Sequence, residues 1–298
     1  KSPPDRRVVL DPKSCQKLLS AFPSAQLIIE SSSIRAFSDT DYLAAGLEVV
    51  SDVSAAEVLI GVKEVPIEAL IPYKSYFFFS HTIKKQPYNR NLLQAILDKN
   101  ITLYDHETLV NESNHRLIGF GYYAGVVGAY NGLRALGLKL NCFELPKATD
   151  LNDRAALNAQ LDQLVVPNVK IVLTGTGRVG QGAKEILDHL NIKQVSIDQF
   201  LNNSLTEAVY VQLDVLDYCE RQDGTTLEKK DFFKHPEAYK STFDRFTAVA
   251  DFFIAGHFYG KEAPAFFTCE QAKAPSFNLK VVADISCDID GPVACTIR

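Results

Sequence analysis

The sequence predicts an α/β protein built from two domains with parallel sheets. Apolar segments of strand length alternate with segments of helical periodicity in both halves of the chain, which is typical of parallel sheets covered by helices. The chain has 298 residues, of which 46% are hydrophobic and 22% charged. This length and composition suffice for two domains that each bury a core.

The first half, residues 1–130, is expected to form one domain. Its short apolar segments predict the following strands: Gln26–Glu30, Leu47–Val50, Val58–Val62, Tyr76–Phe79 and Ile101–Tyr104. Helical spacing predicts helices at Pro12–Phe22, from Ser38 and Asp39 to about Gly46, and at Pro87–Asn100. In the last of these, Leu92, Leu93, Ile96 and Leu97 are expected on one face.

A long helix rich in small residues is expected at Phe120–Gly137. Gly125, Gly128 and Gly132 would weaken a helix. They therefore predict either close packing against another backbone or a linker helix between the domains. The second domain, residues 131–298, then has the following expected segments: a connection at Leu140–Asp153, a helix at Ala155–Val165, strands at Ile171–Leu173, Gln194–Ile197, Val209–Leu213, Asp251–Ala255 and Leu279–Ile285, and helices and loops over Thr226–Thr247.

The segment Ile171–Leu187, IVLTGTGRVGQGAKEIL, predicts a dinucleotide-binding turn. Gly175 allows the tight turn, Gly177 lets the backbone approach a pyrophosphate, and Gly180 lets the helix pack on the strand. The anion would lie on the unpaired N–H groups of the helix N-terminus. The turn residues expected at the cofactor are Gly175, Gly177, Arg178, Val179 and Gly180. The alternative is a glycine turn that serves packing alone.

Charge and cysteine content narrow the classes of function. A net charge of −5 argues against nucleic acid as a partner. No apolar run is long enough to span a bilayer and no signal-peptide pattern is visible, so we expect a cytoplasmic protein without a membrane partner. The six cysteines are scattered without a CxxC pair, which predicts small buried thiols rather than disulfides or a metal site. A homo-oligomer stays open.

Ionisable residues follow several of the predicted strands, where parallel sheets bind ligands. They are Lys63 and Glu64, His81 and Lys84, Asp105, His106 and Glu107, His257, and Asp284. A lone histidine at a strand end is usually structural, but the set predicts a functional cluster of Lys63, His81 and Glu107. Dehydrogenation at an amine carbon needs a base, activation of water at the imine and an acid for the departing amine. A nicotinamide would supply the hydride step.

Arg7, in PPDRRVVLDP, is a further candidate. A guanidinium can hold a substrate carboxylate with two parallel hydrogen bonds. The alternative is that Arg6 and Arg7 form a solvated pair at a strand edge.

Seven segments together resemble the alanine dehydrogenase and nucleotide transhydrogenase superfamily, and within it the saccharopine dehydrogenase branch. They are KSPPDRRVVLDP, LIGVKEVP, FFFSHTIKKQP, ITLYDHETLV, RLIGFGYYAGVVGA, GTGRVGQGA and VVADISCDID. The resemblance implies two Rossmann-like parallel-sheet domains with an active-site cleft between them. It also implies NAD(P)-dependent interconversion of saccharopine with L-lysine and 2-oxoglutarate, so the expected partners are amino-acid and 2-oxo-acid substrates.

The resemblance also assigns roles to residues of this chain. Lys63 and His81 match the catalytic lysine and histidine, while Glu64, Lys84 and Glu107 match the ionisable groups around them. Arg7 matches an arginine that binds a substrate carboxylate. Asp284 matches a polar strand end near the nicotinamide, and Asp198 is the best match to the acidic residue that binds the ribose.

Some features leave the resemblance incomplete. Asp198 could instead begin a helix, so NAD is favoured but NADP is not excluded. The family pattern also includes a strand before KSPPDRR and a C-terminal stretch that returns to the first domain, which this sequence does not contain. Two rival functions stay open: an alanine dehydrogenase-like amino-acid dehydrogenase, and a non-catalytic sensor that binds NAD(H).

Overall fold

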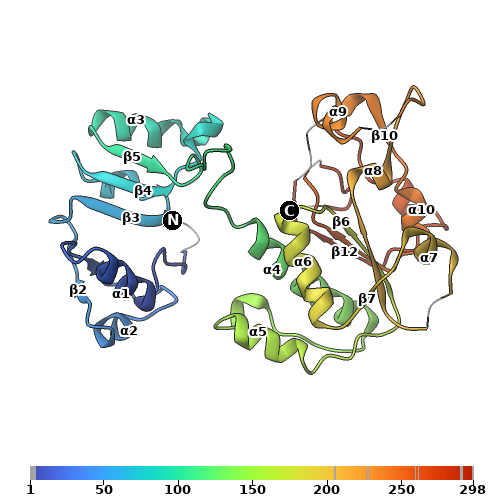
Figure 1. Ribbon diagram of the computed structural model, residues 1–298, viewed down its shortest axis with the longest axis horizontal. Helices are drawn as coiled ribbons and strands as arrows, with labels where there is room; N and C mark the ends of the chain where they lie inside the picture. The colour runs from blue at the N-terminus through green and yellow to red at the C-terminus, as the bar shows by residue number, and fades with distance from the viewer. Residues whose placement is uncertain are drawn as a thin grey trace. The chain divides into compact units, whose positions relative to one another are not determined.

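The structure is a computed structural model that describes residues 5–204, 206–226, 228–258, 260, 262–288 and 291–296. The chain divides into two compact units, Lys1–Gly119 and Phe120–Arg298 (Figure 1). Both are α/β units built on parallel strands, which confirms the predicted class of fold. The cleft that the sequence predicts between two domains stays a prediction.

The first unit alternates short strands and helices. Its elements are α1 (Pro12–Ala21), β1 (Ile28–Glu30), α2 (Asp39–Ala44), β2 (Glu48–Val50), β3 (Val58–Lys63), β4 (Ser75–Phe79), α3 (Arg90–Asp98) and β5 (Thr102–Asp105). These strands form two sheets, β1–β2 and β3–β4–β5, in which every pair is parallel. All the strands that the sequence predicts in this half are present.

Strand β4 divides its side chains between two faces, as a pleated strand must. Tyr76 and Phe78 pack with Leu92 and Ile96 of α3 in one core cluster. Phe77 stacks instead on Tyr104 of β5, at 4.5 Å between ring centroids, on the opposite face. This second face is the one that carries the candidate site.

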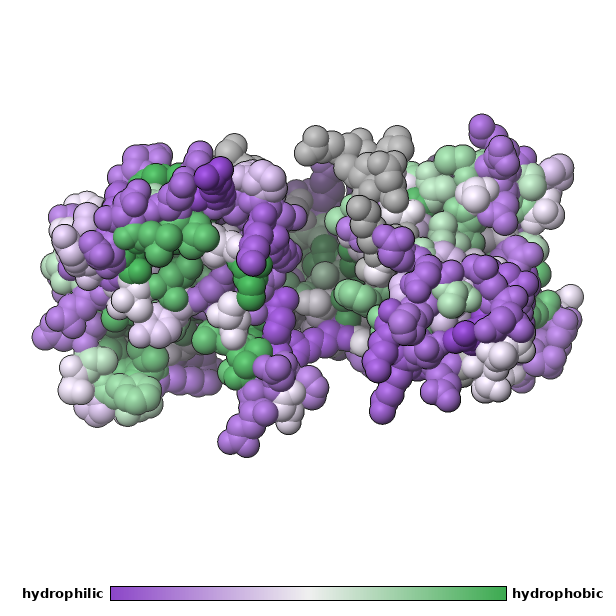
Figure 2. Space-filling model, turned by 90° about the horizontal axis from the view of Figure 1, so that it is seen from above, coloured by the Kyte–Doolittle hydropathy of each residue, from purple (hydrophilic) through white to green (hydrophobic). Residues whose placement is uncertain are grey.

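Of the four apolar residues expected on one face of α3, only two are buried. Leu92 and Ile96 are buried, whereas Leu93 and Leu97 are 40% and 67% exposed. Residues spaced by four lie on one stripe of a helix, and the intervening pair points away from this sheet. Hydrophobic side chains are accordingly visible on the surface of this unit (Figure 2).

The second unit is built around a five-stranded sheet. Its elements are α4 (Gly121–Leu140), α5 (Arg154–Leu161), β6 (Lys170–Thr174), α6 (Arg178–His189), β7 (Lys193–Gln194), α7 (Ile197–Asn202), β8 (Val209–Leu213), α8 (Val215–Tyr218), β9 (Cys219–Arg221), α9 (Lys229–Lys234), β10 (Tyr239–Ser241), α10 (Asp244–Thr247), β11 (Phe252–Ala255) and β12 (Val281–Asp284). The parallel strands are ordered β12–β11–β6–β8–β7. Alternate residues of β6 enter different cores: Ile171 and Leu173 pack toward α4 and α6, and Val172 packs toward the aromatic cluster around Phe243.

The glycines of α4 bring this helix into backbone contact with α6. A Cβ atom on Gly125 would lie 1.9 Å from the carbonyl oxygen of Val179, and one on Gly182 would lie 1.9 Å from that of Tyr122. Of the two roles predicted for the α4 glycines, the structure shows close packing. Gly125 packs against the α6 backbone, whereas Gly128 and Gly132 pack against the side chains of Ile285 and Phe252. The predicted domain boundary after residue 130 falls inside α4, whereas the whole helix belongs to the second unit because of this packing.

Two parts of the second unit differ from the expectation. The strand predicted at Gln194–Ile197 ends at Gln194, because Ser196 caps the N-terminus of α7 with a reciprocal hydrogen bond to Gln199. The segment predicted as helices and loops contains β10, which pairs with β9 in an antiparallel ladder. Among the described helices, none is long and apolar enough to cross a membrane.

Candidate active site

Three side chains at the ends of three strands of the first unit form a hydrogen-bonded chain. The Nζ atom of Lys63 lies 2.8 Å from Nε2 of His81, and Nδ1 of His81 lies 3.0 Å from Oε2 of Glu107. Lys63 ends β3, His81 follows β4 and Glu107 follows β5, so all three lie at the carboxyl ends of neighbouring parallel strands. The structure thus brings together the cluster that the sequence predicts.

Glu107 is more buried than His81 and lies close to several cationic side chains. Its side chain is 9% exposed, against 25% for His81. Lys84 Nζ and Arg116 Nη1 each lie 3.6 Å from Oε1, and both side chains are about half exposed. Lys84 was predicted near the site, but Arg116 was not. No local motif marks Arg116, because a loop rather than a strand end carries it.

The loop that carries His81 is held in a specific conformation. His81 has φ 57° and ψ 9°, in the left-handed region that non-glycine residues seldom occupy. The buried Asp105 accepts hydrogen bonds from the Ser80 hydroxyl and from the Glu107 backbone N–H. Ser80 also lies 2.7 Å from the Thr82 hydroxyl. Asp105 therefore ties together the two loops that present His81 and Glu107, which keeps an unfavourable backbone conformation in place.

The geometry fixes the roles of the imidazole nitrogens. A carboxylate can only accept, so Nδ1 of His81 donates its proton to Glu107. When His81 is neutral, Nε2 is then the acceptor that faces the amine of Lys63. A proton can pass between Lys63 and His81 along this contact, while Glu107 orients the ring and stabilises its cationic form.

Glu64 lies beside this chain of contacts and lines a cavity of about 460 Å³. The cavity wall is mostly apolar and includes Ile67, Tyr88 and Leu92. Asn89, which also lines it, donates a hydrogen bond to the carbonyl oxygen of His81 at 3.4 Å. The structure therefore places Glu64 next to the loop that carries His81, and its role in substrate binding stays a prediction.

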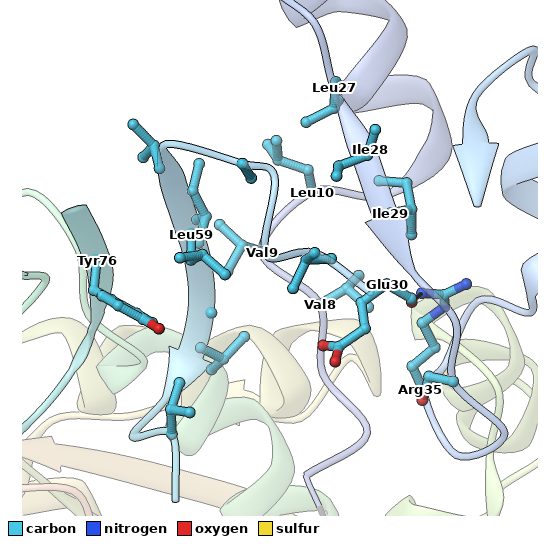
Figure 3. A pocket seen from close by; sticks show the side chains of 18 of the residues that line it. Val8, Val9, Leu10, Leu27, Ile28, Ile29, Glu30, Arg35, Leu59 and Tyr76 are labelled. Carbon is cyan, nitrogen blue, oxygen red and sulfur yellow. Dashed lines mark hydrogen bonds between the residues drawn. The ribbon is translucent and has the colours of Figure 1, made fainter. Parts of the chain in front are cut away.

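Arg7 lies in a different setting. Its guanidinium donates two hydrogen bonds to Asp5, at 2.9 and 2.6 Å, which raises the pKa of Arg7 further. It lines a cavity of about 450 Å³ between β1 and β3 that is not lined by Lys63, His81 or Glu107. Figure 3 shows apolar side chains of the segment after Arg7 between the two strands. They are Val8, Val9 and Leu10, between Leu59 on one side and Ile28 and Ile29 on the other.

The glycine-rich turn of the second unit has the geometry that a dinucleotide needs. Gly175 has φ +93°, and a Cβ atom there would meet the carbonyl oxygen of Gly256 at 2.4 Å. A Cβ atom on Gly180 would lie 2.0 Å from the oxygen of Gly175, so this glycine is required for packing. A Cβ atom on Gly177, by contrast, would face open space. Gly177 is the N-cap of α6, whose first residues are Arg178 and Val179, and no side chain caps this helix end. The turn and the α6 N-terminus therefore fit a pyrophosphate.

The sheet order points to a different acidic residue for the ribose. Asp198 lies in the first turn of α7 and bonds Asn202 at 2.8 Å, beyond the end of the edge strand β7. The strand next to β6 is β8, and Asp214 follows it directly. The Thr176 hydroxyl of the glycine turn donates to Asp214 at 3.0 Å. Sequence order alone made β7 the second strand of the sheet, so Asp214 was missed.

Asp214 carries a negative charge in this setting. Burial opposes its ionisation, but hydrogen bonds from Lys229 and Thr176 outweigh burial and lower its pKa. Asp284, the other acidic residue expected at the cofactor, ends β12 and accepts hydrogen bonds from Ser286 and Thr296, both at 2.6 Å. It therefore holds the loop after β12.

His257 follows β11 at the same end of the sheet and is buried. Its Nδ1 atom lies 3.0 Å from the Thr174 hydroxyl, and its ring packs edge-on against Phe266. Burial lowers the pKa of His257 to about 4, against a smaller opposing effect of Asp284. The imidazole is therefore neutral at physiological pH.

Neither metal ligation nor disulfide chemistry is evident in the described part of the chain. No group of three or more His, Cys, Asp or Glu residues there could hold a metal ion. All six cysteines are free thiols, of which Cys15 and Cys219 are buried. Burial raises the pKa of the Cys219 thiol to about 12, which makes it unreactive.

The fold and site define an α/β protein with a dinucleotide-type turn and a Lys–His–Glu cluster at parallel strand ends. Residues 1–127 match the family described as alanine dehydrogenase/PNT, N-terminal domain. This match covers 127 of the 298 residues, so it shows similarity to this family for the N-terminal part of the chain.

Comparison of sequences gives relatives over 97% of the chain. It is 27% identical to alpha-aminoadipic semialdehyde synthase of Arabidopsis thaliana and 30% identical to the mitochondrial enzyme of that name from Mus musculus. The chain spans only 31% and 35% of these two proteins. It is 25% identical to saccharopine dehydrogenase [NAD(+), L-lysine-forming] of Yarrowia lipolytica and covers 73% of that protein.

Comparison of structures agrees on the fold. An L-alanine dehydrogenase superposes on 98% of the chain with a TM-score of 0.62 at 18% identity, and the match covers 73% of that structure. A transhydrogenase from Sinorhizobium meliloti gives a TM-score of 0.59 at 16% identity, over 98% of this chain and 78% of its own.

Proposed function

We propose that this protein is an NAD(P)-dependent oxidoreductase that interconverts saccharopine with L-lysine and 2-oxoglutarate. The observation that carries the proposal is the hydrogen-bonded chain Lys63–His81–Glu107. The similarity to saccharopine dehydrogenases and to alpha-aminoadipic semialdehyde synthases over 97% of the chain supports the choice of substrate.

The cluster supplies the proton transfers of this reaction. Lys63 takes the proton from the secondary amine of saccharopine as the C–N bond is oxidised. His81 then removes a proton from the water that attacks the imine carbon, and the leaving ε-amine of lysine receives a proton from the same pair. Glu107 holds the His81 ring so that Nε2 faces Lys63.

The charges beside the cluster favour saccharopine over a simpler amino acid. Saccharopine and its 2-oxo-acid product carry more carboxylates than alanine does. Lys84 and Arg116 lie at 3.6 Å from Glu107 and are about half exposed, so both bring positive charge to the edge of the cluster, where it would attract such carboxylates. Arg7 is a further candidate for this role.

The glycine turn supports a nicotinamide dinucleotide as cofactor, and the bound nicotinamide would accept the hydride. Open space at Gly177 leaves room for the pyrophosphate. An ionised Asp214 beside the turn suits the two hydroxyls of a ribose and repels a 2′-phosphate. We therefore propose NAD rather than NADP, with Asp214 rather than Asp198 at the ribose.

The test is oxidation of NADH and of NADPH by the full-length protein with lysine plus 2-oxoglutarate, with pyruvate plus ammonia in parallel. The proposal predicts oxidation of NADH with the lysine pair. Activity with pyruvate and ammonia alone would assign the protein to amino-acid dehydrogenases of the alanine type. Binding of NADH without turnover of any amino acid would favour the sensor function.

A further inference from the structure

Strand β3 contains one residue more than its partner β4 just before Lys63. Ile60 pairs with Phe77 and Lys63 pairs with Phe79, so two residues of β3 oppose one residue of β4. This is a β-bulge at Gly61 and Val62. Because side chains alternate along a strand, the extra residue moves Lys63 to the opposite face of the sheet.

The bulge therefore determines on which face of the sheet the Lys63 side chain lies. With it, Lys63 shares the face of Phe79, and its Nζ lies 5.6 Å from the centroid of that ring and 2.8 Å from His81. In a regular ladder Lys63 would lie on the face of Tyr76 and Phe78, under α3. The hydrogen-bonded chain with His81 and Glu107 would then be lost.

One side chain holds the bulge from the far side of β4. His106, directly after β5, is 6% exposed, and its Nε2 lies 3.1 Å from the carbonyl oxygen of Gly61. Its ring packs edge-on against Phe79, at 5.2 Å between centroids. Its backbone N–H donates to Phe78 at 3.1 Å, which fixes its position along the sheet.

The contact determines the protonation of His106. A carbonyl oxygen only accepts, so Nε2 carries the proton and donates it to Gly61. The other ring nitrogen, Nδ1, is buried and has no hydrogen-bond partner among the described residues.

We propose that His106 is a positioning residue, whose Nε2–H group holds the β3 bulge and so places Lys63 against His81. Its effect on catalysis rests on the proposed function, but its effect on the position of Lys63 does not. No atom of His106 is assigned to the substrate.

The test compares His106→Phe, which keeps a ring beside Phe79 but loses the donor, with His106→Gln, which keeps an N–H donor. His235→Phe, at a histidine that is 61% exposed, is the matched control. Crystal structures give the distance between Lys63 and His81, and steady-state kinetics give kcat and KM. In wild-type protein, ¹⁵N NMR of labelled histidine gives the tautomer of His106 even if a variant fails to fold.

The proposal predicts an Nε2–H tautomer and a Lys63 amine beyond hydrogen-bond distance of His81 in His106→Phe. It predicts a kcat lower by roughly 100-fold with KM little changed, since small displacements of a reacting group have effects of this size. His106→Gln should retain the Lys63–His81 contact and most of the wild-type kcat. An Nδ1–H tautomer, or an unchanged Lys63–His81 contact in His106→Phe, would overturn it. If wild-type protein is inactive with every substrate pair but the Lys63–His81 contact is still lost in His106→Phe, only the proposed function is refuted.

Discussion

Protonation of His257 should make the second unit sensitive to acid. His257 is 8% exposed, and burial lowers its pKa from 6.5 to about 4. Between these pH values the unfolded chain binds a proton that the folded protein does not bind. The free energy of unfolding therefore falls as the pH falls, and the stability is fully present only above the pKa of the unfolded state.

The size of the effect follows from the two pKa values. Each pH unit between 6.5 and about 4 lowers the free energy of unfolding by about 1.4 kcal/mol. The full loss approaches about 3 kcal/mol, which is a large part of the stability of an ordinary domain. Carboxylates also titrate in this range, so the effect must be read as a difference between two proteins.

The comparison is between wild-type protein and His257→Gln, whose amide does not titrate and can still bond Thr174. Urea unfolding at a series of pH values from 7 down to 4 gives the free energy of each. Wild type should lose about 3 kcal/mol more than the variant over this range. Parallel curves, or an NMR titration that gives His257 a pKa near 6.5, would refute the reasoning.

Four further substitutions separate cofactor binding from packing. Gly177→Ala should melt like wild type, because its Cβ atom meets open space, yet bind NADH more weakly in a fluorescence titration; equal binding would contradict the phosphate role. In Gly182→Ala the free energy of unfolding measured in urea should fall by about 1–3 kcal/mol or more, because the Cβ atom would lie 1.9 Å from the Tyr122 carbonyl oxygen. An unchanged free energy of unfolding would contradict this contact. Asp214→Asn should shift the ratio of NADPH to NADH affinity by roughly tenfold toward NADPH, while Asp198→Asn leaves it unchanged; the reverse pattern would restore Asp198 to the ribose.

The candidate cluster could be predicted because it depends on strand ends. Lys63, His81 and Glu107 each follow an apolar run that is recognisable as a buried strand, and parallel strands end at the same edge. The contact between Lys63 and His81 could not be predicted. It depends on the bulge before Lys63, which leaves no mark in the alternation of so short a strand.

The acidic residue beside the glycine turn was not predicted, because strand order in space is not strand order in sequence. β8 lies between β6 and β7, so Asp214 rather than Asp198 lies beside the glycine turn. The β9–β10 ladder was missed for a related reason. Its strands have three residues each, which is too short for a periodic pattern.

The most direct test of the central claim is the rate of NADH oxidation with lysine plus 2-oxoglutarate in Lys63→Ala, beside wild type and the exposed-lysine control Lys17→Ala. We expect a kcat lower by roughly 100-fold or more in Lys63→Ala, because a general base is lost. NADH affinity should be unchanged, and Lys17→Ala should match wild type. Full turnover by Lys63→Ala would contradict the assignment of the chemistry to this cluster.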